Sequence, residues 1–222
     1  MRKIAILALS VLFGLNSFAQ EMDNLYEKNF NIGIDVYSNF WMGIPENVSQ
    51  KGLNTGYSVY GMYNHRLNTS RFSVAGGAGI SSISFASNAV IVDPAAEVIT
   101  LDTIASGIDY DRSKITFTYL DIPLELRYKT PKKLRFAIGL KLGFRLDNHS
   151  KYKGDRFDES GVQIVLKKKD IANTEKILVS STLRIGYKWA NLFLSYSLNK
   201  VFQVEKGPQI HPFSVGLTFN PF

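Results

Sequence analysis

The chain has 222 residues, with 26 basic and 19 acidic side chains and no cysteine. This length is enough for one domain. The absence of cysteine excludes disulfide bonds, thiolate catalysis, a metal site built on cysteine and an acylated N-terminal cysteine. The charge balance is mildly basic, with a net charge of +7.

The beginning of the chain has the features of a secretory signal peptide. A short basic segment precedes an apolar run at residues 4–15, and small residues follow up to Ala19. The apolar run is too short for a transmembrane helix, which needs about 20 residues. We therefore predict residues 1–19 as a cleavable signal peptide and residues 20–222 as the exported domain. Because an exported domain does not meet nucleic acid, we expect no nucleic-acid partner.

The exported domain shows the alternation of apolar and polar residues that is typical of β-strands. The predicted strands are residues 30–41, 55–67, 71–85, 119–129, 134–146, 177–189, 192–200 and 213–220. Most of them exceed the usual strand length of about five to six residues and reach the roughly nine to eleven that cross a bilayer. We therefore predict an all-β fold, an eight-stranded antiparallel up-and-down transmembrane β-barrel. Its apolar face contacts lipid and its charged face lines the lumen.

The connections between these strands alternate between short and long. The short ones are residues 68–70, 130–133 and 190–191, and the long ones are residues 42–54, 86–113, 148–176 and 201–212. An outer-membrane barrel has short turns in the periplasm and long loops outside the cell. The pattern predicts an outer-membrane location with both termini in the periplasm.

Aromatic residues near the strand ends predict the two girdles of a membrane barrel. On the short-turn side the outward set includes Phe30, Tyr63, Phe72, Tyr128, Phe136, Tyr187 and Phe219. On the other side the candidates are Phe40, Trp41, Tyr57, Phe144 and Phe213.

The hairpin at residues 119–146 also carries a family resemblance. Its first strand reads YLDIPLELRY at residues 119–128. This run resembles the YLxIPLLLKY-type strand of the PorT-like outer-membrane β-barrel family of Gram-negative bacteria. The resemblance implies an outer-membrane barrel. Since some PorT relatives are implicated in a protein-secretion system, it also implies secretion-system proteins as candidate partners.

Charged residues at alternate strand positions predict a network inside the lumen. The inward set is Asp35, Asp121, Glu125, Arg127, Lys141, Arg145, Arg184 and Lys188. The interior of an eight-stranded barrel is filled by side chains, so each buried charge needs a partner. We interpret the set as structural ion pairs, with a proton or ion path as the alternative.

The two longest predicted loops differ in charge. Residues 86–113 are acidic, whereas residues 148–176 are basic and include Lys167, Lys168 and Lys169. These three lysines are candidates for contact with lipopolysaccharide phosphate or with an acidic partner. The alternative is a solvated loop or a hairpin extension.

Catalytic residues are hard to find in this sequence. His149 and Ser150 are the candidate pair for a lipid A-modifying enzyme, but neighbours in a strand point to opposite faces and cannot easily form the hydrogen bond that activates serine. We therefore expect no catalytic, cofactor-binding or metal site. The expected role is structural or accessory, in contact with outer-membrane lipid, lipopolysaccharide, the barrel-insertion machinery and a protein partner. A lipid A-modifying enzyme or a narrow conduit is the alternative.

Overall fold

The computed structural model describes residues 29–68, 70–157, 159–187 and 189–220. The predicted signal peptide and Lys188 lie outside these residues. The described chain is all-β, and its strands pair antiparallel. Among the described residues, no helix is both long enough and apolar enough to span a membrane.

Several strands are longer than those of most soluble proteins. Their bounds are β1 (Phe30–Met42), β2 (Thr55–Arg66), β3 (Phe72–Ala86), β4 (Ala89–Val90), β5 (Asp102–Thr103), β6 (Tyr110–Lys129), β7 (Leu134–Arg156), β8 (Glu159–Lys169), β9 (Ile177–Tyr187), β10 (Ala190–Ser197) and β11 (His211–Phe219). β6 has 20 residues and β7 has 23, so these two strands project beyond the others.

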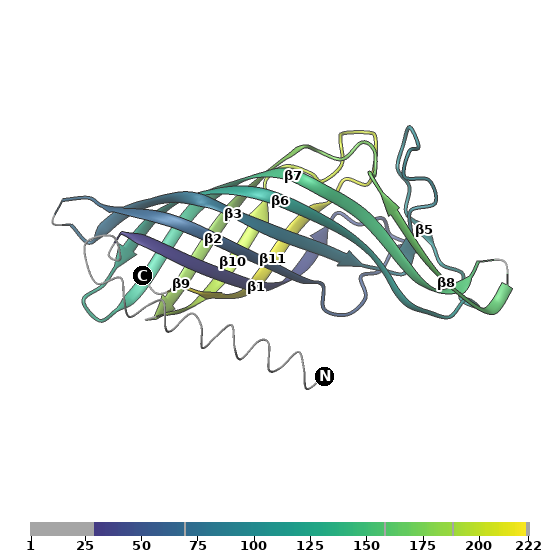
Figure 1. The fold of residues 1–222 in the computed structure, drawn as a ribbon, viewed down its shortest axis with the longest axis horizontal. Coiled ribbons are helices and arrows are strands. Elements are labelled where there is room, and N and C mark those ends of the chain that lie inside the picture. The colour runs from purple at the N-terminus through teal and green to yellow at the C-terminus, as the bar shows by residue number, and fades with distance from the viewer. Residues whose placement is uncertain (1–28, 69, 158, 188, 221–222) are drawn as a thin grey trace.

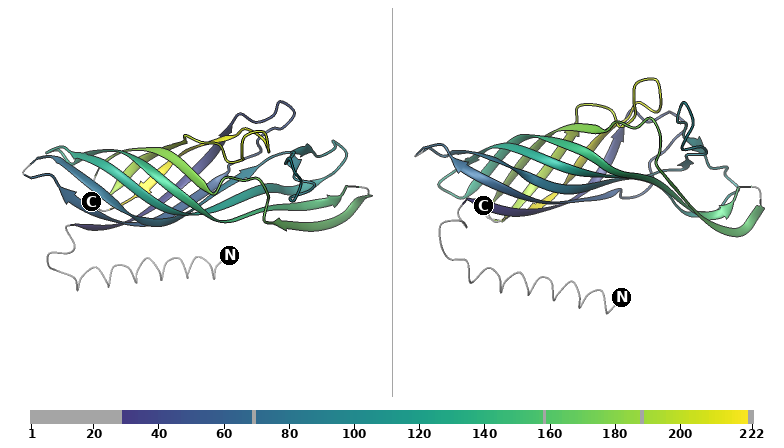
Figure 2. Two further views of the ribbon diagram at one scale, coloured as in Figure 1. Left: turned by 90° about the horizontal axis from the view of Figure 1, so that it is seen from above. Right: turned by 45° about the horizontal axis from the view of Figure 1, so that its top comes forward.

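Most of the strands form one sheet that closes on itself (Figures 1 and 2). The order of neighbours is β6-β3-β2-β1-β11-β10-β9-β7-β8, and β6 also pairs with β7. The β6–β7 pairing closes a ring and leaves β8 attached to β7 alone, while β4 and β5 form a separate small sheet. Because a closed ring has no open edge, its backbone polar groups are paired within the wall. The described sheet is therefore a barrel.

The two ends of the barrel differ in their connections (Figure 1). The connections β2–β3, β6–β7 and β9–β10 are short and lie at one end, which we call the short-turn end. β1 begins and β11 ends at this same end, as their pairing of Ile34 with Phe219 requires. The other end, the long-loop end, carries β4, β5, β8 and the longer connections.

The barrel wall is apolar outside and polar inside. On β1, Ile32 is 59% exposed, whereas Asp35 is 2% exposed. On β6, Leu124 is 50% exposed and the adjacent Glu125 is 3% exposed. A water-soluble sheet places its apolar face in the core. The reversed pattern is the one expected of a strand between lipid and lumen.

The predicted bounds of the central hairpin agree with the structure at the turn but are wrong at the long-loop end, where both strands continue beyond residues 119 and 146. The register of β6 with β7 pairs Thr118 with Asp147 but Tyr119 with Arg145, so Leu146 is an extra residue in β7. A bulge of this kind exchanges the inner and outer faces of the bulged strand. The simple alternation stops there, so the sequence pattern predicts a loop for the residues beyond it. The predicted loops 86–113 and 148–176 in fact contain strand residues of β6, β7 and β8.

The long connections fold over the long-loop end and form a lid, which we define as residues 43–54, 87–109, 170–176 and 198–210. Backbone hydrogen bonds join the separate segments: Ile99 N–H donates to Lys206 O over 2.9 Å, Ala172 N–H to Pro94 O over 2.8 Å, and Gln203 N–H to Asn173 O over 2.8 Å. The lid is thus a built part of the fold and not a set of independent solvated loops.

An apolar core joins the inner face of the barrel at the long-loop end to the lid. Its members are Tyr37, Trp41, Val48, Ile83, Phe85, Ala89, Ile91, Ile99, Leu101, Ile115, Phe117, Tyr119, Ile171, Leu178, Phe193, Val201, Phe202 and Ile210. Trp41 was a candidate for the outer aromatic girdle, and this prediction was wrong. Its ring stacks on Phe85 at 4.4 Å, because its neighbour Phe40 takes the outward position and adjacent strand residues point to opposite faces.

Candidate functional site

The half of the lumen nearer the short turns is organised around Arg184. Its guanidinium contacts Asp35 at 2.9 Å and also binds Glu125, and its Nε donates to the Thr218 hydroxyl over 3.1 Å. Tyr60 and Phe193 lie 5.1 and 4.8 Å from the guanidinium carbon, measured to their ring centroids. The planar cation is therefore held by two carboxylates and two aromatic rings, all away from water.

Other predicted lumen charges join the same network or lie close to it. Arg127 Nε donates to Glu125 over 2.8 Å, and Lys141 Nζ lies 3.2 Å from a carboxylate oxygen of Asp121. The Thr218 hydroxyl donates to Asp35 over 2.6 Å. Pairing of this kind is what makes buried charges tolerable in a low-dielectric interior.

One predicted member, Arg145, stands apart from this network. Arg145 donates from Nη1 to the Thr174 carbonyl over 3.0 Å, so it holds the lid to the barrel end. Lys188 lies outside the described residues. The prediction also left out Arg135, which is 2% exposed and occupies an inward position of β7. The alternation of β7 was the signal that could have included it, since Arg135 falls in phase with the other inward residues.

The lumen is closely packed between the ionic network and the apolar core. The described side chains leave a gap of about 10 Å³ between the ionic network and the apolar core, lined by Tyr37, Asp121, Lys141 and Phe193 among others. This is about the space of one water molecule. At this level the described side chains fill the barrel interior.

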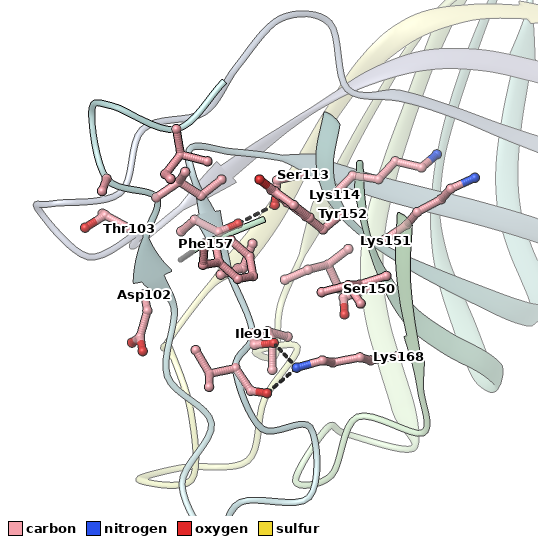
Figure 3. A pocket seen from close by; sticks show the side chains of 18 residues that line it. Ile91, Asp102, Thr103, Ser113, Lys114, Ser150, Lys151, Tyr152, Phe157 and Lys168 are labelled. Carbon is pink, nitrogen blue, oxygen red and sulfur yellow. Dashed lines mark hydrogen bonds between the residues drawn. The ribbon is translucent and has the colours of Figure 1, made fainter. Parts of the chain in front are cut away.

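A much larger cavity lies at the long-loop end, between β4 and β5 of the lid and the projecting parts of β6, β7 and β8 (Figure 3). Its volume is about 540 Å³, within the roughly 300–1,000 Å³ of small-ligand sites. We call it the lid cavity. It is lined by Ala89, Val90, Ile91, Val92, Asp102, Thr103, Ile104, Ala105, Ile108, Ser113, Lys114, Ile115, Ser150, Lys151, Tyr152, Phe157, Leu166 and Lys168.

Polar side chains attach the lid to the strands around this cavity. Lys168 Nζ donates to the carbonyls of Ile91, over 3.3 Å, and of Val92 (Figure 3). The Ser113 hydroxyl, on β6, donates to Ala89 O over 2.5 Å. These contacts join the lid to the strands that form the other walls of the cavity.

The other face of the same three strands is basic. Residues directly opposite each other share a face, and the register pairs Lys114 with Lys151 and Lys151 with Lys167. We define the basic face as Arg112, Lys114, His149, Lys151, Lys153, Lys167 and Lys169. The run of three lysines that the sequence singled out is thus divided, because Lys168 points to the lid cavity and its two neighbours belong to the basic face.

Charges on the basic face are only partly balanced. Lys153 binds Asp111, and this contact holds the pKa of the Asp111 carboxyl below its usual value. Burial lowers the pKa of Lys114, and the neighbouring cations Arg112 and Lys151 lower it further. Like charges directly opposite each other destabilise a sheet. An anion bound to this face would relieve that repulsion.

The basic face begins where the apolar outer surface ends. Leu146 and Ile177, which are 59% and 45% exposed, belong to the apolar surface of the wall. His149 and Lys151 lie three to five residues further along β7, or about 10–17 Å at the usual rise of a strand. Seven basic side chains therefore lie just beyond the surface that would contact hydrocarbon.

His149 and Ser150 do not form a pair. His149 Nδ1 lies 2.8 Å from a carboxylate oxygen of Asp147 on the basic face, whereas Ser150 lines the lid cavity on the opposite side of the sheet. Within the described ranges, no group of three or more His, Cys, Asp or Glu side chains is placed to hold a metal ion.

Comparison with known proteins adds two findings. A family model described as "Outer membrane protein beta-barrel domain" matches residues 8–203. Two crystal structures of Ail, the attachment invasion locus protein of Yersinia pestis, are similar, one of them in complex with the heparin analogue sucrose octasulfate. They are 13% identical (the complex) and 12% identical to this chain, with TM-scores of 0.35 and 0.38. Each alignment covers 86% of this chain, and 97% and 98% of the Ail chains. A search of curated proteins found no match.

Proposed function

Because the chain belongs to the outer membrane protein beta-barrel domain family, we propose that it acts in the outer membrane as a non-enzymatic, eight-stranded PorT-like barrel that binds a partner at the cell surface. The family and the barrel fold support the location. The observation that carries the binding role is the basic face of β6, β7 and β8, which stands just beyond the apolar outer wall.

In this proposal the short-turn end lies in the periplasm, together with both termini, and the lid lies outside the cell. The sorting of short and long connections to opposite ends supports that orientation. Single cysteines test it, since the natural chain has none. A membrane-impermeant maleimide should label Gly107→Cys in the lid of intact cells, and should label Lys132→Cys in the short turn only after the cells are opened. The reverse labelling pattern would mean that the short-turn end faces the cell exterior and the lid faces the periplasm.

Lipid contact of the wall is tested on β6. Spin labels at positions 122, 124 and 126 should collide with oxygen dissolved in the bilayer, and labels at 123 and 125 should be shielded, because the exposed and buried side chains of this strand alternate. Equal shielding at all five positions would mean a soluble strand and would end the membrane proposal.

The surface partner that best fits the basic face is lipopolysaccharide. Its phosphates lie at the outer membrane surface, next to the level that the basic face would occupy. Charge-assisted contacts between lysine and phosphate are stronger than contacts between neutral groups. They would also remove the repulsion along the row Lys114, Lys151 and Lys167.

Native mass spectrometry can measure this binding on barrels reconstituted with phosphorylated or dephosphorylated lipid A. The double variant Lys151→Gln/Lys167→Gln should retain less phosphorylated lipid A than the wild type. The matched control Lys132→Gln/Lys133→Gln, two exposed lysines at the short-turn end, should retain as much as the wild type. Equal retention by all three proteins, or equal binding of dephosphorylated lipid A, would refute the lipopolysaccharide contact.

The accessory role in secretion rests on the PorT resemblance and is tested separately. A pull-down from native membranes should recover an envelope protein complex together with the barrel, and deletion of the gene should reduce secretion. The non-enzymatic role is tested by mass spectrometry of lipid A from the deletion strain. If lipid A is altered, and the wild type restores it but His149→Ala does not, the chain is an enzyme. A steady ion current through the reconstituted barrel would instead indicate a conduit.

A further inference from the structure

The lid cavity combines an apolar lining with a lysine held at its wall (Figure 3). The apolar lining includes Ile91, Ile104, Ile108, Ile115, Phe157 and Leu166. Lys168 enters from β8, and its ammonium group lies beside the carbonyls of Ile91 and Val92. An apolar site with a few placed polar groups is the usual form of a small-ligand site.

The charge of Lys168 is not neutralised by the protein. An ammonium group has three N–H donors, and the two carbonyls accept from two of them. No carboxylate in the described part of the chain forms an ion pair with Lys168. Asp102, the acidic residue of the lining, points away from Lys168 in Figure 3. One donor and one positive charge therefore remain available at the cavity wall.

We propose that the lid cavity binds a medium-chain fatty acid, with the carboxylate on Lys168 and the hydrocarbon tail against the isoleucines. The carboxylate supplies both an acceptor for the third N–H and the missing negative charge. The tail matches a cavity of about 540 Å³ whose walls are mostly apolar. Asp102, Thr103 and Ala105 on the rim are exposed, so the cavity is reached from the solvent. Lys114 and Lys151 border the cavity, but in Figure 3 their ammonium groups point away from it, toward the basic face. This inference is therefore independent of lipopolysaccharide binding.

The experiment uses the full-length barrel in lipid nanodiscs, with isoleucine methyl groups labelled for NMR, and octanoate as the probe. Octanoate should shift and saturate the signals of Ile91, Ile104, Ile108 and Ile115. The lipid-facing Ile32 reports probe dissolved in the bilayer and should change only in proportion to concentration. Octanol should bind more weakly than octanoate, and octylammonium more weakly still, because Lys168 repels it.

Three variants distinguish the contribution of the Lys168 charge to octanoate binding from the contribution of the cavity volume. Lys168→Met keeps the length of the side chain but removes the charge, and should weaken octanoate binding by about 10- to 140-fold, the usual range for a hydrogen bond to a charged group. Ser150→Leu keeps Lys168 but fills space in the cavity, and should weaken octanoate and octanol alike. Lys167→Met, on the opposite face of the same strand, is the matched control and should bind like the wild type.

Several results would overturn the proposal. They are saturation of Ile32 alone, octylammonium binding as tightly as octanoate, or an equal loss of binding in Lys168→Met and Lys167→Met. Because Lys168 also holds the lid, the methyl spectrum of the ligand-free Lys168→Met variant is compared with the wild type. If that spectrum shows a displaced lid, the Ser150→Leu variant becomes the test of the binding site. Octanoate binding that is unchanged in Ser150→Leu would show that the lid cavity is not the site.

Discussion

Glu125→Gln should destabilise the barrel, because it breaks the ionic network at the carboxylate that joins Arg127 to Arg184. Glu125 accepts from Arg127 Nε over 2.8 Å and also from Arg184, and its side chain is 1% exposed. Glutamine keeps one acceptor oxygen but presents an NH₂ group to the second guanidinium. Losing a hydrogen bond to a charged group lowers the free energy of unfolding by about 1.5–3 kcal/mol. Removing one partner of a buried ion pair also leaves a buried charge without compensation, and the combined loss is usually about 3–5 kcal/mol.

Arg184 keeps its contact with Asp35 in this variant, so we expect the lower end of that range, about 3 kcal/mol. The assay is urea unfolding of the barrel reconstituted in lipid vesicles, followed by tryptophan fluorescence. The matched control is Glu97→Gln, since Glu97 pairs with Lys206 at 2.9 Å but is 88% exposed. Screened surface pairs contribute about 0–1 kcal/mol. If the two variants lost the same free energy of unfolding, the buried network would not contribute as argued.

Three further predictions use the same structure. Leu124→Arg places a charge on the outer wall. It should lower the free energy of unfolding by about 2–4 kcal/mol if the position lies near the bilayer midplane, as measured by the same unfolding assay. Phe202→Ala leaves a cavity at a fully buried position of the lid. It should lower the free energy of unfolding by about 3–5 kcal/mol and speed hydrogen exchange of the lid amides. Lys151→Gln should raise the pKa of Lys114, as measured by NMR titration, because it removes one of the cations that lower it. In the wild type the folded pKa of Lys114 lies below its ordinary value of 10.5, so stability should rise with pH between those two values and rise less in Lys151→Gln.

Each of these three has a control within the chain. The control for Leu124→Arg is Val204→Arg, which places an arginine at a lid position that is 67% exposed. It should leave the free energy of unfolding nearly unchanged. Val204→Ala, at the same exposed position, serves as the control for the buried phenylalanine. Lys132→Gln lies at the far end of the barrel and should not move the pKa of Lys114. An effect of equal size in any control would contradict the corresponding argument.

The pattern of the wall was readable from the sequence because it is local. A strand exposes alternate residues to alternate sides, so Leu124 and Glu125 had to face different environments whatever the rest of the chain did. Strand length then suggested a bilayer, and the mixed charges of the other face suggested buried pairs. The particular partners could not be read from the sequence, because the contact of Arg184 with Asp35 joins residues far apart in the chain.

Only the tertiary structure decided what happens at the long-loop end. The bulge at Leu146 exchanges the faces of β7, and no local signal marks it, so the sequence predicts loops where the strands project. Apolar residues such as Ile99 and Phe202 lay in predicted loops, and their burial depends on lid segments that meet only in the folded chain. For the same reason Lys167 and Lys168, adjacent in sequence, face a basic surface and an apolar cavity. Alternation along one strand determines which side a residue takes, but what lies on that side depends on which segments pack there.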